Sequence, residues 1–112
     1  NIGRWDLGGS DRFFTGTIDE VSIYDSALNS SQVSDIYNSG EPTTISGATA
    51  YWKLGEQATF SGGVWTIPDQ IGSNDGTSNA MTIEDREGNA PNSENNAVSY
   101  NMESIDIDNN TP

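Results

Sequence analysis

The sequence predicts an all-β fold, an antiparallel jelly-roll-like sandwich or part of one, with a single short helix. Three observations predict it. Twelve glycines and many Asn, Ser and Thr residues suit short strands joined by tight turns. Several short segments alternate apolar and polar residues with β-branched enrichment. One segment, residues 29–38, instead carries helix signals. Because only 32% of the residues are hydrophobic, the predicted core is thin.

The alternating pattern is clearest in residues 17–25. There Val21 and Ile23 face one side of the predicted strand, whereas Ile18 and Tyr24 face the other. The full set of strands that we expect is 1–6, 12–16, 17–25, 49–54, 64–67 and 97–102.

The helix at 29–38 has a start signal and a stop signal. Asn29 is a favourable N-cap, and Gln32 three residues later completes a capping-box pattern. Gly40 supplies a left-handed stop. A helix this short is marginal alone in water, so we expect its apolar face to dock on a sheet. That face consists of Val33, Ile36 and Tyr37.

The first third of the chain carries a recognisable motif. Residues 14–28 read F-T-G-T-I-D-E-V-S-I-Y-D-S-A-L, and residues 37–40 read Y-N-S-G. With these motifs, residues 1–40 resemble the closing segment of laminin-G-like domains of the concanavalin A-like lectin/glucanase superfamily. The resemblance implies a β-sandwich that serves in binding and adhesion.

A second, opening-like segment follows. Residues 48–56 read A-T-A-Y-W-K-L-G-E and residues 67–77 read I-P-D-Q-I-G-S-N-D-G-T. Residues 48–77 resemble the opening segment of the same laminin-G-like family. The predicted organisation is therefore 1–40 as the C-terminal part of one sandwich, 41–47 as a linker, and 48–112 as a second β-rich segment with a loop-rich tail. A closing half before an opening half resembles a junction of tandem modules, so we expect upstream sequence or partner subunits to complete the sheets.

Composition excludes several functions. With 17 acidic and 4 basic residues, the formal charge is −13, which disfavours binding to nucleic acid and to anionic membranes. No apolar run is long enough for membrane insertion. The chain has no cysteine and no histidine, which removes disulfides, thiolate or imidazole metal sites, and imidazole-based catalysis.

The carboxylates around Glu20 predict no catalytic residue. Retaining hydrolases of this superfamily carry E-x-D-x-x-E on one strand, with carboxylates about 5–5.5 Å apart across the bond. Here Ser22 stands where the middle aspartate belongs. Glu20 and Asp25 would also face opposite sides of a strand. We therefore predict structural carboxylates and a protein that is not an enzyme.

Asp69, Asn74 and Asp75 form an oxygen-rich loop that has two interpretations. Calcium takes six to eight oxygen ligands, and such a loop supplies several. The alternative is a series of Asx turns in which these side chains bind their own backbone. Calcium is the one cofactor that the sequence raises.

Aromatic side chains are the candidates for sugar stacking. Trp65 follows the predicted loop at Gly62 and Gly63 and is the better candidate for an exposed ring that contacts ligand, with core packing as the alternative. Trp52 lies on an alternating strand and is predicted to belong to the core.

The predicted function is that of a non-catalytic virion structural or adhesion protein. The order Y-W-K-L-G-E, W-T-I-P-D, G-S-N-D-G-T and S-Y-N-M resembles the C-terminal part of virion proteins from marine tailed phages. A fibre, tail or capsid-associated appendage is implied. The alternative is a secreted or cell-surface glycan-binding laminin-G-like adhesion module of a bacterium. Either role implies a virion or extracellular location, other virion or surface subunits as partners in a homo-oligomer, and host glycans as ligands.

Overall fold

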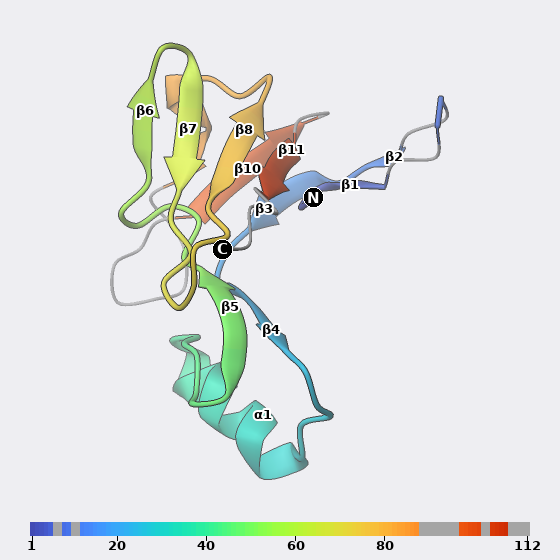
Figure 1. Cartoon of the computed structure of the whole chain (residues 1–112), viewed down its shortest axis with the longest axis vertical. Helices are drawn as coiled ribbons and strands as arrows, with labels where there is room; N and C mark the ends of the chain where they lie inside the picture. Colours follow the sequence, from blue (N-terminus) through green and yellow to red (C-terminus); the bar gives the residue numbers. More distant parts are fainter. Residues whose placement is uncertain (6–7, 10–11, 88–96, 102–103, 108–112) are drawn as a thin grey trace.

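A computed structural model describes residues 1–5, 8–9, 12–87, 97–101 and 104–107. These residues form mostly antiparallel β-structure with one short α-helix, which confirms the predicted class (Figure 1). The strands are divided among small sheets of two, three, four and two strands. The jelly-roll sandwich stays a prediction.

The elements follow one another closely along the chain. The strands are β1 (Arg4–Trp5), β2 (Arg12–Phe13), β3 (Thr15–Ile18), β4 (Val21–Tyr24), β5 (Ala48–Trp52), β6 (Thr59–Ser61), β7 (Val64–Ile67), β8 (Gly76–Asn79), β9 (Arg86–Glu87), β10 (Ala97–Asn101) and β11 (Ser104–Ile107). The helices are α1 (Ser30–Tyr37) and the 3₁₀ turns η1 (Asn38–Gly40) and η2 (Ile83–Asp85). None of the helices in the described ranges is long and apolar enough to cross a membrane.

Pairing joins segments that are distant in sequence. The largest sheet has the order β11-β8-β7-β6, and a second has the order β3-β10-β9. β4 pairs with β5, and β1 pairs with β2. Residues 15–24 therefore contribute strands to sheets that residues 48–101 complete.

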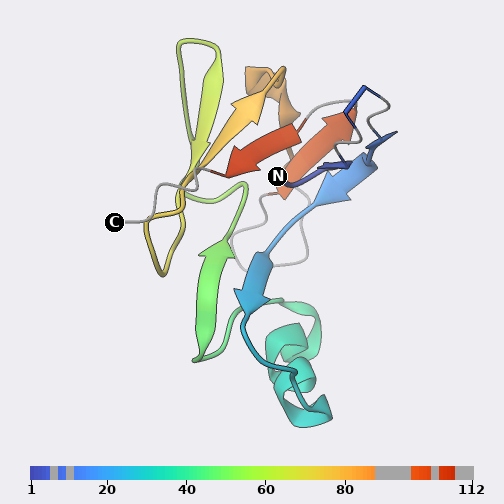
Figure 2. The ribbon, with the colours of Figure 1, turned by 45° about the vertical axis from the view of Figure 1, so that its right-hand side comes forward.

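The predicted single strand over 17–25 is wrong, because the chain bends at Asp19–Glu20 and forms β3 and β4. Glu20 has φ of 54°, a left-handed conformation that is uncommon for a residue other than glycine. The bend lets β3 pair with β10 while β4 turns away to pair with β5 (Figure 2). The predicted strands 49–54, 64–67 and 97–102 correspond to β5, β7 and β10, whereas β6, β8, β9 and β11 were not expected.

The core lies between the large sheet and β5. Its most enclosed side chains are Leu54, Ile67 and Ile105, with relative exposures of 0%, 1% and 0%. An isolated bridge between Ile2 and Ile105 attaches the N-terminal segment to this core. The other buried members of the cluster are Ala50, Trp52, Trp65 and Met81.

The start of α1 is as predicted, but its surroundings are not. Gln32 N donates to Asn29 Oδ1 at 2.8 Å and Asn29 N donates to Gln32 Oε1 at 2.9 Å, which forms the capping box. The helix ends at Asn38 in the left-handed conformation, before Gly40. No residue of α1 is fully buried. Val33 and Tyr37 are 54% and 63% exposed and only Ile36 of the predicted apolar face is partly buried, so the predicted docking of that face as a whole on a sheet is wrong. Figure 1 shows α1 at the end of the β4–β5 lobe that lies away from the large sheet.

A candidate binding cleft between Glu20 and Tyr51

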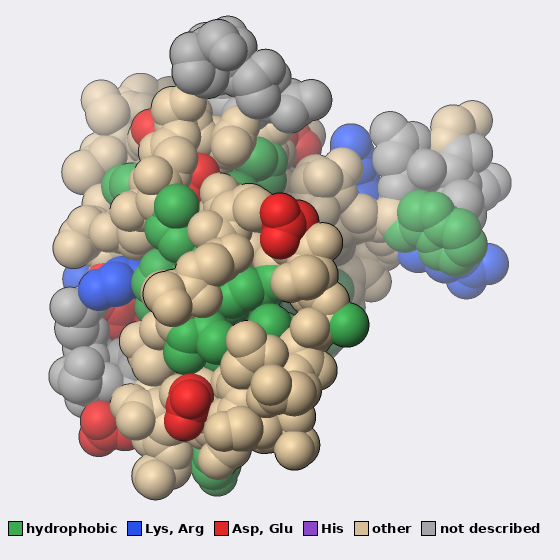
Figure 3. Space-filling model, turned by 60° about the horizontal axis from the view of Figure 1, so that its bottom comes forward, with side chains coloured by type: hydrophobic (Ala, Val, Ile, Leu, Met, Phe, Trp, Pro, Cys, Tyr) green, Lys and Arg blue, Asp and Glu red, His purple; other side chains and the backbone are tan. Residues whose placement is uncertain are grey.

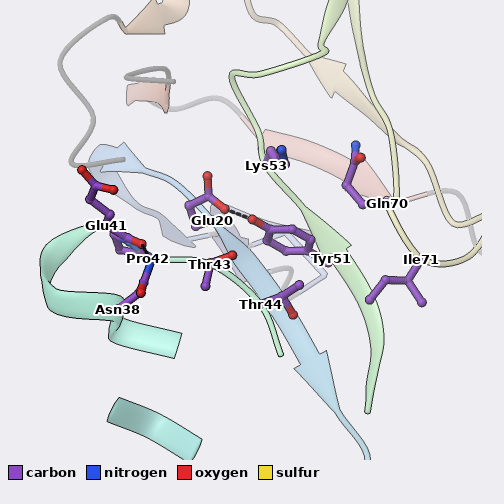
Figure 4. Close-up of a pocket in the computed structure, with 10 residues that line it drawn as sticks. All are labelled: Glu20, Asn38, Glu41, Pro42, Thr43, Thr44, Tyr51, Lys53, Gln70 and Ile71. Carbon is purple, nitrogen blue, oxygen red and sulfur yellow. Dashed lines mark hydrogen bonds between the residues drawn. The ribbon is translucent and has the colours of Figure 1, made fainter. Parts of the chain in front are cut away.

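A polar cleft of about 410 Å³ lies between β5 and the segment that follows α1. Figure 4 shows its side chains, which come from the β3–β4 bend, η1 and its continuation, β5 and the loop after β7. The lining residues are Glu20, Asn38, Glu41, Pro42, Thr43, Thr44, Tyr51, Lys53, Gln70 and Ile71. Hydrogen-bond donors and acceptors thus share one hollow with two apolar surfaces, Pro42 and Ile71.

The floor of the cleft is organised by Tyr51 and Glu20. The Tyr51 hydroxyl donates to the Glu20 carboxylate (Figure 4). Tyr51 is 5% exposed, and this burial raises the pKa of its hydroxyl, as do the hydrogen bond and charge of Glu20 and the charges of Glu56 and Asp19. Tyr51 is therefore a neutral donor at physiological pH, with Glu20 held in one place.

The segment on the other side of the cleft is attached to β4 by Tyr24. The Tyr24 hydroxyl lies 2.8 Å from Thr44 Oγ1 and accepts a hydrogen bond from Ile45 N at 3.1 Å. These bonds position Thr43 and Thr44 opposite Tyr51. The structure therefore holds both walls of the cleft by specific contacts.

Three carboxylates gather behind this floor. One oxygen from each of Asp19, Glu20 and Glu56 lies within 4.8 Å of the others. Glu56 is only 4% exposed, and of the three only Glu20 lines the cleft. Sequence reasoning paired Glu20 with Asp25, but Asp25 is exposed and does not line the cleft. No local pattern links Glu56 to Glu20, because their proximity depends on the pairing of β4 with β5.

The Asp69 loop adjoins the cleft through Gln70 and Ile71. Asp69 Oδ1 accepts hydrogen bonds from Tyr51 N at 3.1 Å and Ile71 N at 3.0 Å, and Oδ2 accepts one from Asn74 N at 3.2 Å. Asp75 Oδ1 in turn accepts a hydrogen bond from Asp69 N at 2.9 Å. The three predicted residues are thus brought together, with carboxylate oxygens directed at backbone N–H groups.

This geometry supports the turn interpretation of the loop. A calcium ligand must offer its lone pairs to the ion, whereas those of Asp69 are taken by N–H donors. Burial raises the pKa of Asp69, but hydrogen bonds from the backbone of Ile71, Tyr51, Gly72 and Asn74 outweigh it, and the net pKa is lowered. The calcium hypothesis stays a prediction that this donor set does not favour.

We expect Asp69→Asn to destabilise the protein by about 1–3 kcal/mol near neutral pH, because an amide cannot accept all of these N–H bonds. The pKa of Asp69 in the folded protein lies below its ordinary value of 3.8. The stability advantage of wild type over Asp69→Asn is therefore fully present when the pH is above 3.8. It is lost as the pH falls through the lower folded pKa. Urea unfolding at neutral pH and at about pH 3 measures both effects. Asp25→Asn, an exposed acid-to-amide change, is the control, and an equal loss in both variants would contradict the prediction.

Trp65 does not have the exposure that the sequence suggested. It is 6% exposed, its Nε1 donates to Thr82 O at 2.7 Å, and its ring lies 5.1 Å from that of Phe60. Of the two interpretations of Trp65, the exposed ring is wrong and core packing is confirmed, because alternate residues of β7 point inward and Trp65 is one of them. Trp52, by contrast, is 2% exposed and confirms its predicted place in the core.

A scan against protein-family models, a search of curated proteins and a search of solved structures each found no match. The laminin-G-like resemblance therefore stays a prediction based on the sequence motifs.

Proposed function

We propose that this protein is a non-catalytic recognition module of an extracellular assembly, and that the Glu20–Tyr51 cleft binds a saccharide. The observation that carries the proposal is the cleft itself, a hollow of about 410 Å³ lined mostly by polar side chains of both hydrogen-bonding types. Its volume lies within the range of about 300–1,000 Å³ of ligand sites in proteins.

Saccharide chemistry fits this lining. Sugar hydroxyls both donate and accept hydrogen bonds, and the cleft offers carboxylates, threonine hydroxyls, amides and an ammonium group. Pro42 and Ile71 supply surface for the C–H faces of a sugar ring. With Glu20 and Glu41 against Lys53 alone, the lining favours a neutral or amino sugar over a sulfated or uronic one.

The same lining supports recognition over hydrolysis. A glycosidase needs two carboxyl groups across the scissile bond, one as acid and one as base or nucleophile. In this cleft Glu20 is already bound by Tyr51, and Glu41 is exposed at the rim. Glu56, which lies close to Glu20, is buried outside the cleft.

We expect the protein to bind neutral or amino glycans on an array. Glu41→Gln and Gln70→Ala are each expected to weaken binding of the best-bound glycan by roughly tenfold, because each removes one polar contact. Titration calorimetry measures the change. Asp35→Asn is the matched control, since it removes one charge from an exposed acid on α1 outside the cleft.

Three results would overturn this function. Binding that is equally weakened by Asp35→Asn, or absent from every glycan, would remove the cleft as a saccharide site. Release of reducing ends from laminarin, agarose or alginate, abolished by Glu20→Gln, would replace recognition with catalysis.

The setting that the sequence favours for this module is the particle of a marine tailed phage, with the surface of a bacterium as the alternative. The β4–β5 sheet, which has only two strands in the part of the chain that is described, suits an assembly in which neighbouring chains add strands. Antibody labelling of phage particles and of bacterial surfaces in electron micrographs separates the two settings.

A further inference from the structure

The β1–β2 hairpin forms an arm that projects from the body, as Figures 1 and 3 show. We define the arm by residues 3–5 and 12–14. Trp5 is 64% exposed and Phe14 is 46% exposed, and both border an open hollow of about 370 Å³. Large aromatic rings in this position are unusual for a surface that faces only water.

The hollow is also positively charged, in contrast to the chain as a whole. It contains Arg4 and Arg12, two of the four basic residues of a chain with a net charge of −13. The side chains that line it are otherwise apolar, with no carboxylate, amide or hydroxyl among those described. Asp6 and Asp11, which adjoin it in sequence, lie outside the described residues. A hollow with an exposed cationic donor, Arg12, and aromatic surface fits a partner that presents a carboxylate beside an apolar group.

The chain itself carries such a group at η2. Ile83 is 57% exposed, and the exposed Glu84 follows it. The turn is held by its own capping box, in which Thr82 N donates to Asp85 Oδ2 at 2.6 Å and Glu84 N donates to Thr82 Oγ1 at 3.4 Å. We call Ile83 and Glu84 the η2 knob. It presents one aliphatic and one acidic side chain on a preformed turn.

We propose that the arm of one copy binds the η2 knob of a second copy, with Ile83 against Trp5 and Phe14 and with Glu84 against Arg12. In Figure 1 the arm extends to the right, whereas η2 lies at the upper left, so the two surfaces of one chain do not meet. Because arm and knob are different surfaces, the contact is heterologous and builds a ring or an open chain of subunits. It does not depend on what the cleft binds.

The experiment uses sedimentation velocity over a concentration series. Wild-type protein is expected to associate, while Trp5→Ser in the arm and Ile83→Ser in the knob each weaken association by roughly tenfold or more. An equimolar mixture of the two variants is expected to form dimers and nothing larger, since each pair retains one intact arm and one intact knob. Val33→Ser, at a 54% exposed position of α1, is the matched control and is expected to associate like wild type.

A charge exchange tests the pairing of particular residues. Arg12→Glu and Glu84→Arg are each expected to weaken association, whereas combining both changes in one chain is expected to restore it, because every arm–knob contact then has its two charges exchanged. Circular dichroism checks that each variant keeps its fold, which the exposure of the substituted residues favours.

Several outcomes would overturn the proposal: a wild-type protein that stays monomeric, a mixture of arm and knob variants that forms no dimer, or Val33→Ser acting like Trp5→Ser. Binding of alginate by the arm, lost in Trp5→Ser without any change in association, would reassign the hollow to an anionic polysaccharide.

Discussion

Replacing Ile67 by alanine is expected to lower the free energy of unfolding by about 2–5 kcal/mol. Ile67 is 1% exposed on the inward face of β7, within the cluster that includes Leu54, Trp65 and Ile105. Its truncation removes buried apolar contacts and leaves a cavity that the paired strands around it can fill only in part. Domains are typically stable by only 5–15 kcal/mol, so the loss is a large fraction of the total. Urea unfolding measures it.

Ile71→Ala is the matched control, because it deletes the same atoms from a side chain that is 48% exposed. We expect this variant to lose about 0.5 kcal/mol or less, as for most surface substitutions. Similar losses at both positions would show that the cluster around Ile67 is not the core of the folded protein.

Gly76→Val is expected to produce the second large effect, a loss of about 1–3 kcal/mol or more from overpacking. Gly76 is buried in β8, and a Cβ at this position would lie 2.7 Å from Ile105 Cγ2 and 3.1 Å from Ile107 Cδ1. These atoms belong to β11, which pairs with β8, so a larger side chain would separate the two strands. Thermal unfolding and amide exchange of β8 and β11 report the change.

Thr77→Val, one residue further along β8, is the control for Gly76→Val. Thr77 is exposed, so its substitution changes β-propensity and little packing. A Gly76→Val protein as stable as Thr77→Val would mean that β11 does not pack on β8 as described.

The cleft and the arm together describe a module with two separate surfaces. The cleft is acidic and rich in hydrogen-bonding groups, whereas the arm combines arginines with aromatic rings. Their different chemistry makes the two proposals independent, since Glu41→Gln addresses ligand binding and Trp5→Ser addresses association. Each can fail without affecting the other.

Local features were predictable because their causes lie within a few residues. The capping box of Asn29 and Gln32 needs only a side chain and a backbone group three positions apart. Residues 64–67 form β7 with the bounds expected from their alternation. In the same way, the burial of Trp52 follows from an apolar strand with a β-branched and aromatic pattern.

The candidate cleft was not predictable, because its parts come from four segments. Its floor needs the left-handed bend at Glu20, the pairing of β4 with β5 that places Tyr51 beside it, and the reach of Asp69 to the Tyr51 backbone. The sequence raised Glu20 only as a partner of Asp25, on the assumption of one continuous strand. A strand that changes sheets at a bend breaks that assumption.

By itself, the sequence determined the all-β class, the single capped helix and the acidic, cysteine-free and histidine-free chemistry of this protein, because composition and short-range patterns suffice for these. Only the tertiary structure decided that Trp65 is buried, that Val33 and Tyr37 of α1 are exposed, and that Glu20, Tyr51 and Lys53 line one cleft. These properties depend on which strands pair across tens of residues, and such long-range contacts leave no periodic signal in the segments that make them.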